Sequence, residues 1–182
     1  MNRILNTSLL ILLTTQNILA FDINKLDVPE NFKVEIFVED IEAPRQMAEG
    51  EDGYIFVGSK KGLVYAMRDH DGNGKIDDVE IIAKDLNDSS GVAYHEGSLF
   101  IAEIDKVWRI DNIEKQLADF NDTVLEKTLV TADLPSDAWH GRKWIMVDKD
   151  GSILLNVGAP CNVCLKEDER YATILRYRDN SW

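Results

Sequence analysis

The chain has 182 residues, and its 33 acidic against 20 basic side chains give a formal net charge of −13. Such a surface repels the phosphates of nucleic acids and of anionic lipids, so we expect small molecules, cations or other proteins as partners. A hydrophobic share of 45% and a charged share of 29% are ordinary for a globular domain and exclude a disordered chain.

The first residues have the pattern of a secretory signal. Arg3 precedes an apolar run, and Ala20 offers a small side chain where signal peptidase could cut. The run is too short and too polar to span a bilayer, which takes about 20 apolar residues. We therefore expect a signal peptide over 1–20, one domain over 21–182, and a periplasmic or secreted protein without a membrane span after cleavage. An uncleaved anchor is the alternative, because Ile18 is larger than the preferred alanine.

Three similar stretches recur along the rest of the chain. Each has a glycine turn, an apolar strand and then a small residue, and the apolar strands are 54–57, 99–102 and 153–156. Their spacing of roughly 45 to 55 residues is the period of a four-stranded propeller blade. Further strands are expected before and after these three, at 46–48, 63–68, 91–94, 106–110, 144–147 and 174–177.

These repeats predict an all-β fold, namely a β-propeller. Helical periodicity is confined to 113–120, which we expect to cap an insertion between blades. A β-sandwich also has many short strands, but it does not require similar units. About three blades fit into 21–182, whereas a propeller closes with at least about four, so the ring is expected to be incomplete.

The stretch DHDGNGKIDDVE has the spacing of a calcium-binding loop. Counting from Asp69, oxygen ligands fall at positions 1, 3, 5, 7, 9 and 12, supplied by Asp69, Asp71, Asn73, the Lys75 carbonyl, Asp77 and Glu80. Closely spaced carboxylates repel one another unless a cation offsets their charge. We interpret the stretch as a calcium-stabilised turn between strands, with a metal-free acidic turn as the alternative.

His140 is the candidate catalytic residue. An isolated histidine in a loop is more often structural, but this one directly precedes an expected innermost strand, and such strands line the channel where propellers bind ligands. A neutral imidazole there could accept a proton from a substrate hydroxyl. Arg142 or Lys143 could then hold an anionic group.

Cys161 and Cys164 are the two cysteines of the chain. In an oxidising compartment they favour a disulfide that stiffens a loop at the channel mouth, although the C-x-x-C spacing also suits redox exchange. Leu165 follows where a haem-attachment motif needs histidine, and no second ligand pair supports zinc.

The chain resembles the glucose/sorbosone dehydrogenase family, especially its sorbosone dehydrogenase-like branch, over essentially all of residues 27–178. The resemblance rests on APRQMA, MRDHDGNGKIDDV, GVAYHEGSLFIAE and RYATILRY, and most specifically on HGRKW followed by VGAPCNVC. It implies a six-bladed propeller that holds pyrroloquinoline quinone (PQQ) in its central channel and oxidises sugars or related aldehydes and alcohols.

By the same resemblance, His140 matches the catalytic base, and Arg45 and Asn162 fall on loops that face the channel. These two residues and Arg142 are the candidates for cofactor binding. No glutamine stands in LNDSSGVAY where the glucose dehydrogenase branch contacts its cofactor, and Asn87 or Ser89 would substitute only loosely. The family's main quinone-binding residues and catalytic calcium ligands lie in later blades. The calcium loop is therefore expected to be a separate, structural site.

Two functions follow as hypotheses. The first is the N-terminal fragment of an exported PQQ-dependent sugar or aldehyde dehydrogenase, inactive alone, whose whole form also meets an electron-acceptor protein. The second is a non-catalytic, calcium-stabilised propeller module for binding or structure.

Overall fold

The computed structural model describes residues 22–121 and 123–182. It divides into two compact units, one ending at Glu35 and one covering Ile36–Trp182. The described part of the first unit contains a short 3-10 helix, η1 (Ile23–Lys25), capped by the Asp22 carboxylate. The expected signal peptide lies outside the described residues. In the described ranges, no helix has the length and apolar character needed to cross a membrane.

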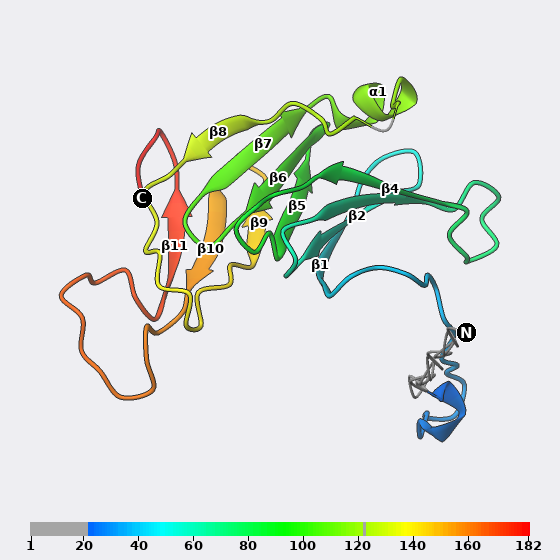
Figure 1. The fold of residues 1–182 in the computed structure, drawn as a ribbon, viewed down its shortest axis with the longest axis horizontal. Helices are drawn as coiled ribbons and strands as arrows, with labels where there is room; N and C mark the ends of the chain where they lie inside the picture. The colour runs from blue at the N-terminus through cyan, green and yellow to red at the C-terminus, as the bar shows by residue number, and fades with distance from the viewer. Residues whose placement is uncertain (1–21, 122) are drawn as a thin grey trace, which may run out of the picture. The chain divides into compact units, whose positions relative to one another are not determined.

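The second unit consists of three antiparallel sheets whose strands follow one another in chain order (Figure 1). We call them blades 1, 2 and 3. Blade 1 contains β1 (Pro44–Glu49), β2 (Tyr54–Ser59), β3 (Val64–Arg68) and β4 (Asp78–Ala83). Blade 2 contains β5 (Gly91–His95), β6 (Ser98–Ala102), β7 (Val107–Asp111) and β8 (Thr128–Thr131). Blade 3 contains β9 (Ile145–Val147), β10 (Ile153–Val157) and β11 (Thr173–Tyr177).

This arrangement confirms the all-β fold of three similar units and excludes a two-sheet sandwich. The helix is shorter than expected: α1 covers Ile113–Ala118 and lies between β7 and β8, inside blade 2 rather than between blades. Its buried face consists of Ile113 and Leu117. Both belong to the buried cluster that blades 1 and 2 share, so α1 packs into the core between these two blades.

Glycine turns join the first two strands of every blade. Gly53, Gly97 and Gly151 all have positive φ angles of 74° to 79°. In the first two turns the preceding residues, Asp52 and Glu96, also have positive φ. Two successive residues of this kind form the tight hairpin turn that matches the twist of paired strands. The repeated turn signal in the sequence therefore sets the start of the second strand in each blade.

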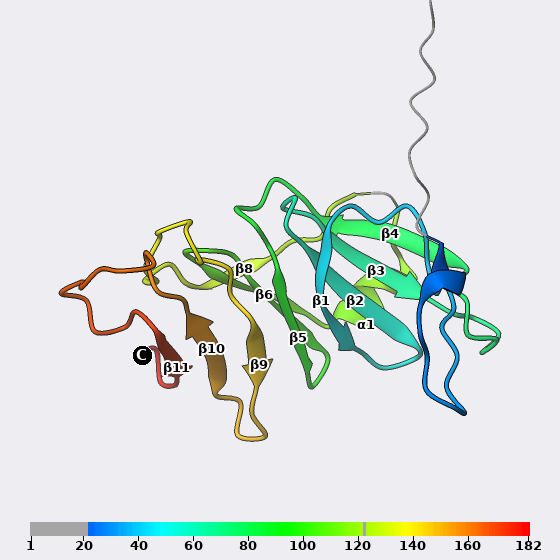
Figure 2. The same cartoon turned by 90° about the horizontal axis from the view of Figure 1, so that it is seen from below.

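The first strands of the three blades lie beside one another, β1 next to β5 and β5 next to β9, as Figure 2 shows. The blades pack face to face behind this row. Phe56 and Val64 of blade 1 are buried against Leu99 and Ile101 of blade 2. Between blades 2 and 3 the buried residues include Ala102, Val107, Ile153 and Leu155. Apolar residues on one face of blade 2 therefore pack against blade 1, and those on its other face pack against blade 3.

Candidate functional site

The loops that lead into the first strands gather at one end of the blades. Gln46, near the start of β1, forms hydrogen bonds with two of these segments. Its side-chain Nε2 donates to the Ile145 carbonyl at 2.6 Å, and its Oε1 accepts from the Ile145 N–H at 3.0 Å. Its own backbone N–H donates to the Ser90 carbonyl at 3.2 Å. One residue of blade 1 is thus bonded to the entrances of both other blades.

Gly91 makes this close approach possible. A Cβ atom at this buried position would lie 2.6 Å from the Lys143 carbonyl oxygen and 3.2 Å from the Ile145 side chain. Any side chain here would push the entrance of β9 away from β5, because the nearest of these atoms is backbone. The glycine at the start of β5 therefore has a packing role at the site.

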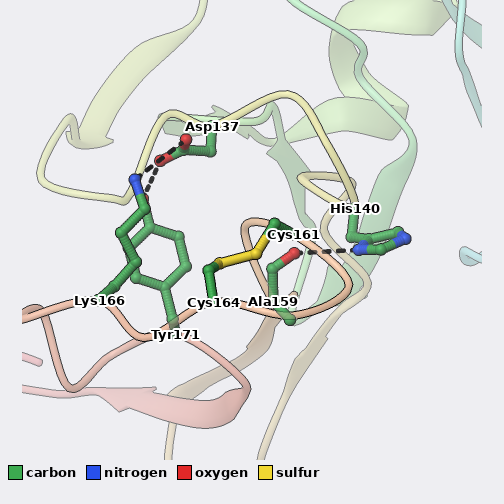
Figure 3. Close-up of a disulfide and its surroundings, with 7 residues drawn as sticks. All are labelled: Asp137, His140, Ala159, Cys161, Cys164, Lys166 and Tyr171. Atoms are coloured by element: carbon green, nitrogen blue, oxygen red, sulfur yellow. Dashed lines mark hydrogen bonds and ion pairs between the residues drawn. A yellow bond between two sulfur atoms is a disulfide. The ribbon is translucent and has the colours of Figure 1, made fainter.

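His140 lies in the loop before β9, with an exposed side chain and a positive φ of 54°. Its Nδ1 lies 3.0 Å from the Ala159 carbonyl oxygen, as Figure 3 shows. A carbonyl oxygen only accepts, so this contact assigns the proton of the neutral imidazole to Nδ1 and leaves the lone pair on Nε2. Behind the turn, a Cβ on Gly158 would lie 2.0 Å from the His140 carbonyl oxygen. The two loops therefore fit closely against each other.

Asn156 of β10 fixes the segment between His140 and β9. Its Oδ1 accepts from the Trp144 N–H at 2.6 Å, and its Nδ2 donates to the Arg142 carbonyl at 3.1 Å. The Asn156 backbone N–H also donates to the Trp144 carbonyl at 3.4 Å, so this residue extends the contact between the two strands beyond the start of β9. The orientation of the histidine loop thus depends on a polar residue in the neighbouring strand.

Arg142 is paired with an acid of blade 2. Its Nε lies 3.0 Å from Asp88 Oδ2, and the Ser90 hydroxyl donates to the same carboxylate. The ion pair offsets much of the positive charge expected for an anion-binding arginine. In this structure Arg142 joins blade 3 to blade 2.

Lys143 is buried, with only 1% of its surface exposed. Its ammonium donates to the Gly141 carbonyl at 2.6 Å. Burial lowers the pKa of this lysine to about 8, and the charge of Asp105 opposes the shift. Lys143 therefore supports the histidine loop from inside and is not placed to hold an anion in the channel.

The disulfide between Cys161 and Cys164 is present, which confirms that expectation. Its loop is anchored around Asp137, where Lys166 Nζ lies 3.5 Å from Oδ1 and the Tyr171 hydroxyl donates to Oδ2 (Figure 3). The Tyr171 hydrogen bond lowers the pKa of Asp137, and the same bond together with burial raises the pKa of Tyr171 to about 12. The anchor is therefore a charged carboxylate under a neutral phenol.

The remaining candidates for cofactor contact are exposed. Asn162 stands within the disulfide loop. Arg45 lies at the start of β1, where its guanidinium donates to the Pro44 carbonyl at 2.8 Å. Asn87 and Ser89 are engaged elsewhere: Asn87 donates to Glu103 and Asp105, and the buried Ser89 hydroxyl donates to backbone carbonyls of blade 1. The buried Ser89 hydroxyl is therefore not placed to substitute for a cofactor-binding glutamine, and the exposed Asn87 amide is bonded to Asp105 of blade 2.

The acidic loop joins β3 to β4. Ligand oxygens of Asp69, Asp71 and Asp77 all lie within 4.8 Å of one another. Asp69 accepts from the N–H groups of Gly72, Asn73 and Gly74, and these bonds, led by that of Gly74, lower its pKa. The loop thus holds its first carboxylate ionised and its backbone curled around it.

Of the other expected ligands, Asn73 and Lys75 lie within the loop, whereas Glu80 does not. The Asn73 Oδ1 accepts from the Lys75 N–H at 2.8 Å, so both residues lie inside the turn. Glu80 instead lies within β4, opposite Ala66 of β3, and outside the group of three aspartates. Strand pairing takes the chain out of the loop before its twelfth position is reached.

Sequence reasoning missed Gln46, Asp88 and Asn156 as site residues. Asn156 carries a signal, since it is a polar residue in the apolar strand β10, whereas β1 already contains Arg45 and Glu49 and does not single out Gln46. The partner of Gln46 is 99 residues away in the chain, so local pattern could not name it.

No protein-family model matches the chain. An uncharacterised protein of Borreliella burgdorferi (strain B31) is 32% identical over an alignment of 148 residues, and the match covers 76% of this chain and 37% of that protein. The chain thus spans little more than a third of the length of this relative.

Solved structures share the fold. The holo PQQ domain of a pyranose dehydrogenase from Coprinopsis cinerea matches with a TM-score of 0.57 and 15% identity, over 70% of this chain and 30% of that one. A Trichoderma reesei carbohydrate-active enzyme of family AA12 matches with a TM-score of 0.61 and 14% identity, over 79% and 37%. The fold is that of part of a PQQ-domain propeller. At these identities the likeness establishes architecture, and activity is a separate question.

Proposed function

We propose that this chain forms the histidine-bearing side of the channel in an exported, PQQ-dependent sugar or aldehyde dehydrogenase. The observation that carries the proposal is the fixed tautomer of His140, with Nδ1 on the Ala159 carbonyl and the Nε2 lone pair exposed at the strand entrances. An imidazole in this tautomer can accept a proton at Nε2. Structural likeness to PQQ-domain enzymes supports the assignment of cofactor class.

The described residues fit one side of a quinone site. PQQ is anionic, and Arg45 offers an exposed guanidinium near the same end of the blades, with Asn162 as a neutral hydrogen-bonding group. Arg142 fits less well, because Asp88 already neutralises it. The resemblance puts the stronger quinone-binding residues in later blades, so we expect residues 22–182 alone to bind PQQ weakly and to lack turnover.

When bound, PQQ accepts the hydride of the substrate. His140 Nε2 would take the proton of the substrate hydroxyl while the C–H bond at the carbon that carries this hydroxyl breaks. The products would be a carbonyl compound and an imidazolium. The Ala159 carbonyl holds the other nitrogen and stabilises the positive ring. An electron-acceptor protein would then regenerate the quinone.

The acidic loop is proposed as a structural calcium site, separate from the chemistry. Asp69, Asp71, Asn73, Asp77 and the Lys75 carbonyl supply hard oxygen ligands of the kind that calcium prefers. With Glu80 drawn into β4, we expect water to complete the coordination. The Cys161–Cys164 disulfide supports export, since such bonds persist in oxidising compartments.

A PQQ titration tests the cofactor assignment. We expect the longest natural protein that contains these residues to quench or shift the PQQ absorption, and Arg45→Ala to weaken that binding about tenfold, the loss of one charge-assisted contact. Lys61→Ala, another exposed cation on blade 1, is the matched control and should leave binding unchanged. Absence of PQQ binding would favour the non-catalytic module instead.

A further inference from the structure

Trp139 and His140 occupy the two corners of a tight turn. The Gly141 N–H donates to the Ala138 carbonyl at 3.1 Å, which closes the turn around them. His140, the third residue of the turn, has a positive φ of 54°. Glycine or asparagine is usual at such a position, and a bulkier residue is retained there mainly where strain serves a function. The strained corner thus points to a functional role for the tip of this loop.

The two corner side chains form one aromatic surface. Their ring centroids lie 5.3 Å apart, and the ring planes meet at 54°. Both side chains are exposed, the indole to 60%. The Ala159 carbonyl accepts from His140 Nδ1 and so holds the imidazole beside the indole (Figure 3). A small molecule that contacts one of these rings is therefore close enough to contact the other.

The strand registers show what the position of Trp139 holds in the other blades. In each blade the residue three places after the turn glycine pairs with a residue of the first strand, and these pairs align the blades. The aligned residues of the first strands are Ala48, Ala93 and Met146. Seven places before them stand Ile41, Leu86 and Trp139. Trp139 thus takes the place of an aliphatic residue.

The two aliphatic residues pack inward, each on the side of the preceding blade. Leu86, before blade 2, packs into the cluster between blades 1 and 2. Ile41, before blade 1, packs on the opposite face of that blade. By the same rule, the side chain at position 139 would pack between blades 2 and 3, where Leu134 is buried instead. Trp139 therefore points away from an interface whose two blades are both described.

The backbone explains the difference. Asp40 and Asp85, directly before the two aliphatic residues, have positive φ angles of 61° and 59°. In the third loop the positive φ falls two places later, on His140. Because the chain turns at a different residue, the side chain of Trp139 leaves the blade rather than entering it. The exposure of the indole is thus a property of its own turn.

We propose that Trp139 determines the specificity of the site: the indole binds one face of a ring-form sugar, and His140 meets a hydroxyl at the rim of the same ring. The inference rests on the proposed function, in which His140 is the base. The face of an aromatic ring carries partial negative charge and attracts the C–H groups that cover one side of a pyranose. A flat apolar group with one polar group beside it is a common composition of ligand sites.

The same contact discriminates against open-chain compounds. A pyranose keeps its C–H groups on a rigid face, whereas an open-chain aldehyde or polyol must give up torsional freedom to present one. Of the two substrate classes in the proposed function, sugars and aldehydes, Trp139 therefore selects sugars in their ring form. PQQ is also flat, so stacking on the quinone is the competing role for the indole.

Saturation-transfer NMR measures the sugar contact without turnover. The longest natural protein containing these residues is mixed with D-glucose, D-galactose, D-mannose or D-xylose, and with the corresponding open-chain alditols. We expect transfer to the ring protons of at least one aldose and little to its alditol. Trp139→Ala should weaken aldose binding about tenfold at an unchanged Tm, because the indole is exposed, while Trp139→Phe keeps an aromatic ring and should retain most of the binding.

Val163→Ala, at a 95% exposed apolar residue of the disulfide loop, is the matched control and should bind the aldose as the parent protein does. Binding to none of the four aldoses would overturn the proposal. Equal aldose binding by the parent protein and by Trp139→Ala would overturn it as well.

PQQ titration of the same variants separates this proposal from the proposed function. Trp139→Ala should bind PQQ as the parent protein does, and a loss would assign the indole to the quinone and overturn the sugar contact. A protein that binds an aldose through Trp139 but binds no PQQ would keep the sugar site and refute the dehydrogenase. A dehydrogenase whose KM for aldoses is the same after Trp139→Ala would refute the sugar site alone.

Discussion

The side-chain amide of Gln46 hydrogen-bonds both the N–H and the carbonyl of Ile145, two blades away. Gln46→Leu keeps the size of the side chain but leaves both partly buried backbone groups without this partner. We expect it to lower the free energy of unfolding by about 1 to 3 kcal/mol. Arg45→Ala, next to it and exposed, should change stability by less than about 0.5 kcal/mol. Urea denaturation measures the free energy of unfolding of both variants. Equally small losses in both would show that the hydrogen bonds between Gln46 and Ile145 contribute little to stability.

Lys143 predicts a pH dependence. Folding lowers its pKa from 10.5 to about 8, so between these values the unfolded chain binds the proton that the folded chain has lost. Stability should therefore rise with pH across this window, by about 3 kcal/mol, relative to Lys143→Met. Below pH 8 the difference between the two proteins should be constant. Parallel stability curves from pH 7 to 11 would contradict a buried, desolvated lysine.

Calcium is predicted to stabilise the acidic loop. At a hundredfold excess over the dissociation constant, binding to the folded state alone adds about 2.7 kcal/mol to stability. Asp71→Ala should abolish the rise in Tm, since the Asp71 carboxylate is one of three that converge there. Glu126→Gln, an exposed acid outside the group, should retain it. Identical thermal scans with calcium and with EDTA would retire the calcium assignment.

The disulfide gives a chemical prediction. Alkylation without reductant should label neither Cys161 nor Cys164 in the exported protein. Replacing both by serine should cost about 2 kcal/mol or less, because the loop that the bond closes is very short. The stronger effect of the replacement should be a weakened hydrogen bond between His140 Nδ1 and the Ala159 carbonyl, read as a change in the NMR shifts of the imidazole. Quantitative labelling of both thiols in the native protein would indicate a redox pair instead.

Local patterns were sufficient for the inner part of each blade. The glycine turns and the apolar runs after them predicted β2, β6 and β10 and their neighbours, because a tight turn fixes strand direction and pairing. The outer strands β4 and β8 were not predicted. Half of their residues face solvent, and in β4 the alternation begins inside the motif interpreted as a calcium loop.

The disulfide was predictable because its two cysteines lie in one short stretch of chain, whereas the catalytic role of His140 stays a prediction. Both the cysteine pair and His140 were singled out by residue type and position in the sequence. The Asp88 partner of Arg142 and the burial of Lys143 were not, because both depend on how loops of different blades meet. Glu80 shows the same limit, since its ligand role depended on loop spacing and strand pairing determined its place.

Dye reduction by the longest natural protein containing these residues, supplied with PQQ, calcium and a panel of aldoses and aldehydes, tests the role of His140 most directly. We expect turnover, and we expect His140→Asn, which keeps a donor toward the Ala159 carbonyl but has no basic nitrogen, to lower kcat about 100- to 10,000-fold. PQQ binding and Tm should stay unchanged in that variant. Turnover that is equally fast with asparagine at this position would contradict the assignment of His140 as the base.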